Sequence, residues 1–350
     1  MNIHEKYMLR CIELGKKGLG SSAPNPMVGS VVVYEDKIIG EGFTSPYGGP
    51  HAEVNAIGSV RDKQLLKKST LYVTLEPCSH YGKTPPCADL IIESKIPEVV
   101  IGIQDPHKKV AGKGIQKLWD AGCKVTIGIL EQECKNHHKR FLTFQEKKRP
   151  YIVLKWAETS DGFIAPDKRL RNESPEPFWI TNPYSKQTVH QWRTEEQAIL
   201  VGTSTVLEDN PKLTVRHWAG KNPIRIILDR QLKIPSDFHV LDGSVETMAF
   251  TEFDDSSQYV DGVTYKLLDF NQSLPGQICD WLHKLSISSV LIEGGSQTLQ
   301  GFIDAKLWDE ARIFTGDTTF GSGIRAPKIS GHTLTSTNLL SDNLTLLIND

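Results

Sequence analysis

The sequence is poor in the features that mark secreted and membrane proteins. Six cysteines in 350 residues are too few for a disulfide framework. No stretch reaches the roughly 20 apolar residues of a membrane span. The segment 1–7 lacks the apolar core of a signal peptide. We therefore expect a cytoplasmic protein with no membrane partner.

An excess of charge of one sign is also missing. The formal net charge is −2, whereas a nucleic-acid-binding surface needs a concentrated excess of Lys and Arg. A hydrophobic content of 39% and a charged content of 23% are ordinary for a globular protein. We predict two domains from the length and no nucleic-acid partner. The sequence leaves open whether the chain forms a homo-oligomer.

Three soft metal ligands do occur between residues 51 and 87. His51 is followed by Ala and Glu53, Cys78 ends the run Thr-Leu-Glu-Pro-Cys, and Cys87 comes after eight further residues. One imidazole and two thiolates suffice to hold zinc and leave its fourth position open to water. The carboxylate of Glu53 is placed to carry protons. This set is typical of zinc-dependent deaminases, in which activated water attacks an amine-bearing ring carbon.

The eight-residue gap departs from the usual Pro-Cys-x-x-Cys spacing. A structural zinc site would need a fourth protein ligand, for which His80 is the nearby candidate. Lys83 and Thr84 in the same gap suit contacts to a substrate phosphate, although solvated loop residues would look the same. Gly82-Lys83-Thr84 also imitates the end of a P-loop, but the glycine required at position 77 is a proline, so a nucleotide triphosphatase is rejected.

Apolar β-rich runs alternate with helical patterns in the first half of the chain. Strands are predicted at 31–34, 71–75, 99–103 and 125–129, and helices at 4–18, from 51, from 87 and at 112–121. This alternation predicts a three-layer α/β/α domain. Cys78 then lies at the carboxyl end of a strand, where open α/β sheets bind ligands. Two prolines hold Asn25 rigidly at the start of a strand, although a plain turn is equally consistent.

A polar, charged passage at 136–150 separates two apolar halves. It predicts a domain junction at 146–150, and hence domains 1–146 and 147–350. The adjacent His137 and His138 are badly placed for one metal, and we interpret them as surface residues. Later in the chain, the glycines of Glu293-Gly-Gly-Ser296 allow close approach of a ligand, and a helix from Ser296 would direct amides at a phosphate. A tight turn is an equal alternative, and no Gly-x-Gly-x-x-Gly indicates a standard Rossmann site.

The motifs of the first half resemble one particular family. The runs 24–29 (Pro-Asn-Pro-Met-Val-Gly), 51–53 and 74–87 are similar to the deaminase domain of the bifunctional riboflavin-biosynthesis deaminase/reductase, in which the long cysteine gap is normal. The resemblance implies a cytidine-deaminase-like domain with zinc on His51, Cys78 and Cys87 and with Glu53 as proton carrier. It also implies substrate contacts by a further set: Asn25, His80, Lys83 and Thr84.

The second half is similar to the reductase domain of the same family, which has a dihydrofolate-reductase-like fold. The resemblance is carried by Lys155, Asp161-Gly162, the run 179–181, Arg193 and the runs 202–216 and 293–296. It implies NADPH contacts at Ala157, Trp179, Thr205, Asp209, Gly295, Ser296 and Gly301. It implies substrate contacts at Arg193, Leu213, Arg216 and Glu293, the two arginines being suited to grip a sugar phosphate bidentately.

The chain departs from the family pattern at two places. Thr159-Ser160-Asp161-Gly162 stands where family members usually have Ser-Leu-Asp-Gly. Pro177, after an insertion of charged residues, stands where they usually have a serine two residues before the tryptophan. The resemblance covers roughly residues 4 to 320, and the segment 332–350 matches no pattern that indicates a function.

The resemblance implies two successive reactions. Zinc-dependent hydrolysis would deaminate 2,5-diamino-6-ribosylamino-4(3H)-pyrimidinone 5′-phosphate, and NADPH would then reduce the ribosyl group to a ribityl chain. One alternative is a zinc deaminase of another nucleoside or of tRNA, with an inactive reductase-like accessory domain. Another is a zinc protein without enzymatic activity, whose second half only binds nucleotides.

Overall fold

The computed structural model describes residues 2–81, 85–106, 111–170 and 175–349. The chain separates into two compact units, Met1–Lys148 and Arg149–Asp350, and each is described by itself. The division into a deaminase domain at 1–146 and a reductase domain at 147–350 stays a prediction. No helix in the described ranges is long and apolar enough to cross a membrane.

The first unit is built on a five-stranded sheet in the order β2-β1-β3-β4-β5. A hairpin of β1 (Gly29–Tyr34) and β2 (Lys37–Phe43) forms one edge, and its turn places Glu35 and Asp36 at positive φ. β1 also pairs antiparallel with β3 (Thr70–Leu75), which is parallel to β4 (Glu98–Ile103). β5 (Lys124–Ile127) completes the parallel part.

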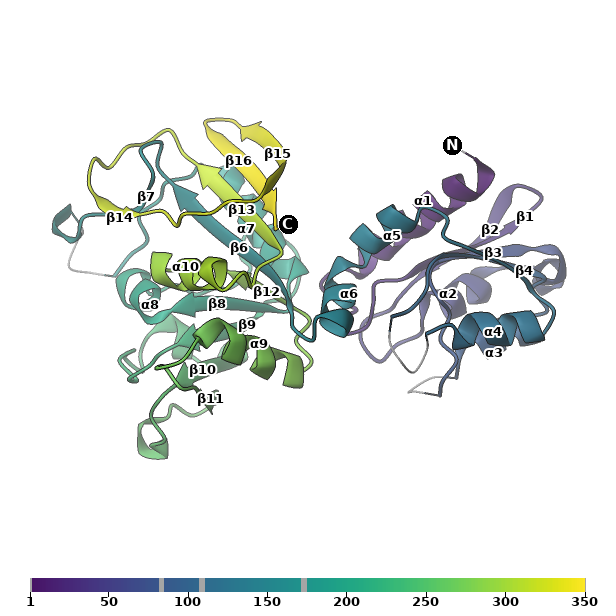
Figure 1. The fold of residues 1–350 in the computed structure, drawn as a ribbon, viewed down its shortest axis with the longest axis horizontal. Helices are drawn as coiled ribbons and strands as arrows, with labels where there is room; N and C mark the ends of the chain where they lie inside the picture. Colours follow the sequence, from purple (N-terminus) through teal and green to yellow (C-terminus); the bar gives the residue numbers. More distant parts are fainter. Residues whose placement is uncertain (1, 82–84, 107–110, 171–174, 350) are drawn as a thin grey trace. The chain divides into compact units, whose positions relative to one another are not determined.

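Helices cover both faces of this sheet (Figure 1). α1 (Ile3–Gly15) and α5 (Glu131–His137) lie on one face, and α2 (Ala52–Ser59), α3 (Cys87–Glu93) and α4 (Lys113–Asp120) lie on the other. α6 (Lys139–Glu146) ends the unit, and short 3-10 helices span Lys16–Gly18 and Lys63–Lys68. The apolar faces of these elements form one continuous core. The predicted three-layer order is therefore present.

The second unit contains a nine-stranded sheet in the order β11-β10-β9-β8-β12-β6-β13-β16-β15. The first seven of these strands are parallel, and β16 runs antiparallel to β13. The strands span Tyr151–Glu158 (β6), Ala198–Gly202 (β8), Ile224–Leu228 (β9), Thr247–Thr251 (β10), Val263–Leu267 (β11), Ser289–Ile292 (β12), Glu310–Thr315 (β13), His332–Leu339 (β15) and Asp342–Ile348 (β16). A separate pair joins β7 (Phe163–Pro166) to β14 (Gly323–Arg325).

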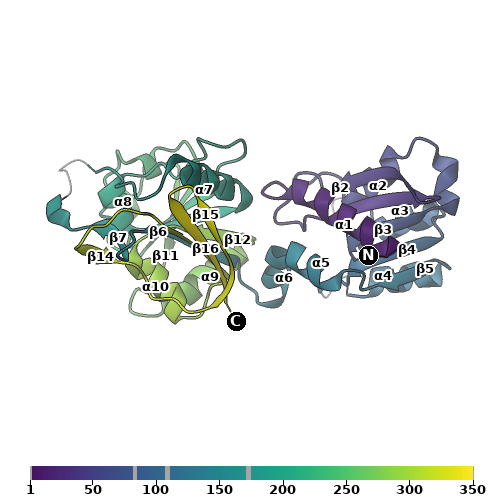
Figure 2. The same ribbon diagram turned by 90° about the horizontal axis from the view of Figure 1, so that it is seen from above.

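Alternation along the strands divides the core of this unit between the two faces of the sheet. Ile152 and Leu154 of β6 contribute to the face covered by α9 (Leu274–Lys284) and α10 (Ser296–Asp304). Tyr151 and Val153 contribute to the face covered by α7 (Pro183–Glu195). α8 (Thr203–Asp209) follows β8 on the α7 side, where Val206 is buried. Figure 2 shows the same division of the helices. Short 3-10 turns at Lys168–Leu170, His239–Leu241 and Ser256–Gln258 occupy loops.

The last hairpin, β15–β16, is joined to the start of α7. Asn182 caps this helix by accepting the amides of Tyr184 and Ser185, and its own side chain donates to the carbonyl of Leu339. The buried carboxylate of Asp342 accepts from the amide of Asn182 and from the hydroxyl of Ser185. The segment 332–350, for which the sequence indicated no function, therefore fixes the amino-terminal end of α7.

Candidate active sites

Three predicted metal ligands meet at the carboxyl end of β3. The ligand atoms of His51, Cys78 and Cys87 all lie within 4.8 Å of one another. His51 Nδ1 is 3.6 Å from Cys78 Sγ and 3.3 Å from Cys87 Sγ. In a tetrahedral zinc site with Zn–N near 2.0 Å and Zn–S near 2.3 Å, neighbouring ligand atoms stand about 3.5 Å apart. The donor set therefore fits one zinc ion.

The local sequence places each of these three side chains. His51 is the residue before α2 and makes no capping hydrogen bond with its side chain, so its ring is free to face the thiols. Cys78 follows β3 after the turn made by Glu76 and Pro77. Cys87 is the first residue of α3, and its amide donates to Cys78 Sγ at 3.3 Å. A helix start directed at a sulfur favours the thiolate form that binds metal.

The two thiols have different proton affinities because they share a site. The hydrogen bond from Cys87 lowers the pKa of Cys78 to about 4, with burial opposing this shift and His51 adding to it. The same contact and burial raise the pKa of Cys87 well above its ordinary value. The hydrogen bond with Cys78 also raises the pKa of His51. Cys78 is thus the more acidic of the two thiols.

Glu53 lies beside this group in the first turn of α2. Its side chain is buried, with 4% of the residue exposed. Burial, followed by the nearby Cys78 charge, raises the pKa of Glu53 to about 7. A carboxyl group that titrates near neutrality can both accept and return a proton. The structure therefore places a suitable proton carrier next to the three ligands.

Glu76 is a site residue that the sequence analysis did not single out. Its buried carboxylate accepts four backbone amides, from Asp105 (3.2 Å), Gly112 (2.9 Å), Gly114 (2.9 Å) and Ile115 (3.2 Å). A Cβ at Gly114 would come within 2.0 Å of the carbonyl oxygen of Pro77. The amino-terminal end of α4 is therefore pressed against the turn that leads to Cys78.

The predicted substrate contacts of this unit lie on two loops. Asn25 is half-buried in the turn before β1, where its backbone N–H donates to the carbonyl of Ser22. His80 is exposed directly after the Cys78 turn. Lys83 and Thr84 lie outside the described residues. The substrate roles of all four stay predictions.

The interpretation of His137 and His138 as surface residues is wrong. They are 6% and 1% exposed, because α5 and α6 pack their junction against the loop before β1. His137 Nε2 lies 2.7 Å from the carbonyl oxygen of Met27, and His138 Nε2 lies 2.9 Å from Thr74 Oγ1. Burial lowers the pKa of His137 to about 4. His137 supports the loop that carries Asn25, His138 contacts β3, and neither ring faces solvent.

In the second unit a buried ion cluster lies at the carboxyl end of β12, beside the middle of β6. Glu293 follows β12, and the strand register places it beside Lys155 of β6, whose Nζ is 3.8 Å from Glu293 Oε2. Arg193 of α7 donates to both Glu293 oxygens at 2.8 Å. Although burial opposes it, the charges of Arg193 and Lys155 lower the pKa of Glu293 to about 2. Burial lowers the pKa of Lys155.

This cluster engages Arg193 in a way that the sequence did not indicate. Nε and Nη2 of its guanidinium go to Glu293, and Nη1 donates to the carbonyl of Thr214 at 3.1 Å. In this arrangement all three guanidinium nitrogens of Arg193 donate to the protein, so no pair of them faces outward to bind a phosphate bidentately. Arg216, in contrast, is exposed and donates from Nη1 to Thr214 Oγ1, and Leu213 is buried beneath this loop.

The predicted cofactor residues gather where β8 and β12, which are neighbours, end. A Cβ at Gly294 would lie 2.9 Å from Thr205 Oγ1, and one at Gly202 would lie 2.7 Å from Thr298 Oγ1. Gly295 has a φ of 62° and precedes Ser296, the first residue of α10. The glycines therefore allow Thr205 and Thr298 to pack closely against the turn that leads into α10, whose first amides suit a phosphate-bearing cofactor.

The remaining cofactor candidates lie on other elements of the second unit or further along α10. Ala157 is on β6, and the exposed ring of Trp179 lies under Lys186 Nζ, 3.5 Å from the ring centroid. Asp209 ends α8. Gly301 lies further along α10 and faces Pro275 of α9. The NADPH contacts of all these residues stay predictions.

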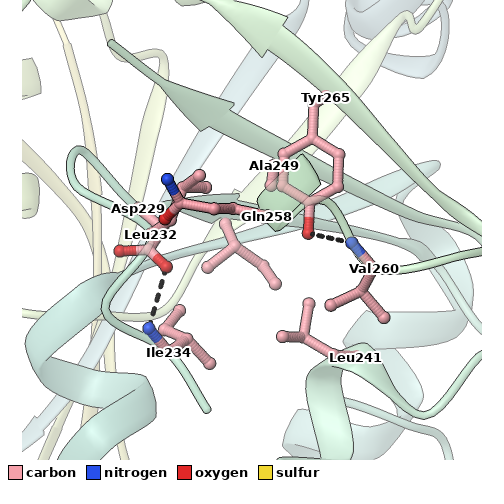
Figure 3. Close-up of a pocket in the computed structure, with 9 residues that line it drawn as sticks. Asp229, Leu232, Ile234, Leu241, Ala249, Gln258, Val260 and Tyr265 are labelled. Atoms are coloured by element: carbon pink, nitrogen blue, oxygen red, sulfur yellow. Dashed lines mark hydrogen bonds between the residues drawn. The ribbon is translucent and has the colours of Figure 1, made fainter. Parts of the chain in front are cut away.

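A small cavity of about 30 Å³ lies elsewhere, on one face of β9, β10 and β11 and beneath the loops that follow β9 and β10 (Figure 3). Asp229 and Tyr265 border it, but Asp229 accepts the amides of Lys233 and Ile234, and Tyr265 accepts the amide of Val260. This volume holds a water molecule or two, so the cavity is no site for either substrate.

Comparison with known proteins agrees with the two sites. Residues 150–348 match the family described as RibD C-terminal domain, and residues 1–103 match the cytidine and deoxycytidylate deaminase zinc-binding region. The riboflavin biosynthesis protein RibD of Aquifex aeolicus is 40% identical over 328 residues, which cover 92% of this chain and 89% of the relative. This chain belongs to the RibD family.

Other RibD proteins match over the same length. RibD of Bacillus amyloliquefaciens is 40% identical over 94% of this chain and 88% of its own. The crystal structure of a diaminohydroxyphosphoribosylaminopyrimidine deaminase/5-amino-6-(5-phosphoribosylamino)uracil reductase from Thermotoga maritima superimposes with a TM-score of 0.90, at 40% identity, over 99% of both chains.

Membership in the RibD family confirms several predictions. The chain is a bifunctional deaminase and reductase of riboflavin biosynthesis, with zinc as the cofactor of the deaminase and NADPH as that of the reductase. The predicted fold class is confirmed as a cytidine-deaminase-like domain followed by a dihydrofolate-reductase-like domain.

Proposed function

We propose that the chain deaminates 2,5-diamino-6-ribosylamino-4(3H)-pyrimidinone 5′-phosphate and then reduces the product. In the first step water replaces the ring amine and ammonia leaves. In the second step a hydride from NADPH reaches C1′ of the opened ribosyl group, a proton completes the reduction, and a ribityl chain results. The printed name of the Thermotoga maritima relative, which contains both activities and both phosphoribosyl compounds, supports this substrate.

The residues of the deaminase site have distinct roles in this proposal. His51, Cys78 and Cys87 hold zinc, which when bound activates water for attack on the ring carbon. Glu53 accepts the proton of the attacking water and delivers it to the departing amine, because its buried carboxyl group lies in the first turn of α2 beside the three ligands. Asn25 and His80 bind the substrate from the two loops beside the site.

The residues of the reductase site act by positioning and charge. Thr205 and the Gly294–Ser296 turn hold the cofactor phosphates. Arg216 meets the substrate phosphate, because its guanidinium is exposed on a loop next to the ion cluster. Glu293 contacts the sugar as a carboxylate, and Lys155 and Arg193 keep this carboxylate charged and in place.

We also place the reaction in the cytoplasm. All six cysteines are free thiols, and three of them, Cys11, Cys134 and Cys279, are buried away from the zinc site. Free thiols suit a reducing compartment. The use of NADPH as reductant suits the same compartment.

The convergence of His51, Cys78 and Cys87 beside Glu53 carries the proposal. The test supplies the purified protein with the pyrimidine ribosyl phosphate, with and without NADPH. We expect ammonia release without NADPH, and NADPH oxidation only after deamination. Absence of both signals from zinc-loaded protein would refute the proposal.

A Glu53→Gln variant tests the proton carrier. It removes one ionisable group and keeps all three ligands, so zinc content and NADPH oxidation on pre-deaminated substrate should equal those of the wild type. Ammonia release should fall by about 10²–10⁴-fold. Glu93→Gln, at an exposed position of α3, is the matched control. Normal ammonia release by the Glu53 variant would show that another group carries the proton.

A further inference from the structure

Two side chains of α7, three residues apart, hold the loop that carries Arg216. Arg193 donates from Nη1 to the carbonyl of Thr214 at 3.1 Å, and His190 Nδ1 accepts the backbone amide of Arg216 at 3.1 Å. Residues at i and i+3 share one face of a helix. The helix therefore holds the main chain of this loop through one carbonyl and one amide, two residues apart.

The hydrogen bond fixes the chemical form of His190. An imidazole nitrogen that accepts an amide hydrogen carries no proton, so a neutral ring has its proton on Nε2. His190 is 5% exposed, and its ring stands edge-on to His217 with the centroids 4.8 Å apart. Burial, together with the charges of Arg193 and Arg216, lowers the pKa of His190 to about 4 despite Glu293 nearby. The surroundings thus favour the neutral ring.

The loop that His190 holds is fixed at each successive residue. Leu213 is buried at a φ of 53°, and Thr214 accepts from Arg193. The amide of Val215 donates to Asn222 Oδ1 at 2.8 Å. Only then does the chain reach the exposed side chain of Arg216. The guanidinium is therefore presented from a main chain with little freedom, and His190 supplies the last of the contacts.

We propose that His190 is a positioning residue of the reductase, which fixes the main chain of Arg216 so that its guanidinium meets the phosphate of the substrate. This inference rests on the proposed function, because the phosphate belongs to the proposed substrate. In this role His190 acts through the main chain of Arg216 and not by its own contact with the sugar or the cofactor. Its loss should weaken substrate binding and leave the hydride step intact.

Two substitutions separate the hydrogen bond from the volume of the ring. His190→Phe fills the space without an acceptor, and His190→Asn places Oδ1 where Nδ1 stood. A hydrogen bond contributes about 0.5–1.5 kcal/mol, so we expect His190→Phe to raise KM for the deaminated substrate about 2- to 12-fold with kcat within about twofold. His190→Asn should restore KM. Gln187→Ala, at an exposed position of α7, is the control and should leave both constants unchanged.

A double-mutant cycle tests whether His190 acts through Arg216. Arg216→Ala should raise KM by itself, and adding His190→Phe should then cause no further rise. An equal rise in both backgrounds, an unchanged KM for His190→Phe, or a loss confined to kcat would overturn the proposal.

The tautomer of the His190 ring can be measured in the wild-type chain, even if the variants fail to fold. Nitrogen-15 NMR of histidine-labelled protein, with His190 assigned from the Asn variant, should show a neutral ring with its proton on Nε2 at neutral pH. A charged ring or a proton on Nδ1 would overturn the proposal. A wild-type chain that oxidises no NADPH would instead refute the proposed reductase step, so the two failures are distinguishable.

Discussion

The carboxylate of Glu76 offers a sharp test of how the zinc site is held. It is 3% exposed and accepts four backbone amides that come from residues 105 to 115. Glu76→Gln keeps the shape of the side chain but leaves one acceptor oxygen, which can serve two of the four. The new NH₂ group then faces the other two amides. Two buried donors lose their acceptor.

The expected effect follows from the cost of an unsatisfied buried amide. At about 1–3 kcal/mol each, two such amides destabilise the first unit by about 2–6 kcal/mol, a large part of the 5–15 kcal/mol typical of a domain. For a unit of this size the unfolding temperature should fall by roughly 5–20 °C. The second unit contains none of these contacts, so its stability should not change.

The two activities of the chain report on the two units separately. Samples are heated in steps and cooled, and the residual deaminase and reductase rates are measured on the same protein. Glu76→Gln should lose deaminase activity at a lower temperature than Glu93→Gln, while the reductase curves coincide. Amide exchange should show lost protection at Gly112, Gly114 and Ile115. Coincident deaminase curves and unchanged exchange would refute the role given to Glu76.

Three further predictions concern the cofactors and charges. Removal of zinc by a chelator should abolish ammonia release and leave NADPH oxidation on pre-deaminated substrate intact, because His51, Cys78 and Cys87 all lie in the first unit; equal loss of both activities would contradict this. Glu293→Gln should leave Arg193 and Lys155 without their buried partner, abolish reduction and destabilise the second unit by about 3–5 kcal/mol, with deamination as the internal control. Since the pKa of Glu293 is lowered to about 2, its contribution to stability is present above about pH 5 and is lost as the pH falls towards 2. Acid unfolding of the wild-type second unit should therefore be steeper than that of the variant, and parallel curves would show that this carboxylate is not held as described.

The zinc site was predictable because its members belong to adjacent short motifs. His51, Cys78 and Cys87 come from the start of α2, the end of β3 and the start of α3, and local sequence identifies each of these ends. β1, β3, β4 and β5 and the helices α1 to α4 were predictable for the same reason, since their apolar periods are local. α6 and the end of α5 fall in the polar passage from which the sequence predicted only a domain junction.

Contacts between distant residues were not predictable in this way. Glu76 binds amides about 30 to 40 residues further along the chain, and nothing in Thr-Leu-Glu-Pro-Cys indicates those partners. His137 and His138 looked like part of a polar linker, and only the packing of α5 and α6 buries them. Arg193 looked free to bind phosphate because Glu293 lies 100 residues away in the sequence.

The contact between Asp342 and the start of α7 has a consequence for damaged or shortened versions of this chain. Every residue proposed to touch substrate or cofactor lies before residue 302, so a premature stop near residue 340 would leave each of them in place. Such a chain would nevertheless lack the strand that covers β13 and the carboxylate that anchors the helix carrying His190 and Arg193. A gene that encodes every proposed contact residue can thus still produce a protein that deaminates the substrate but no longer reduces it.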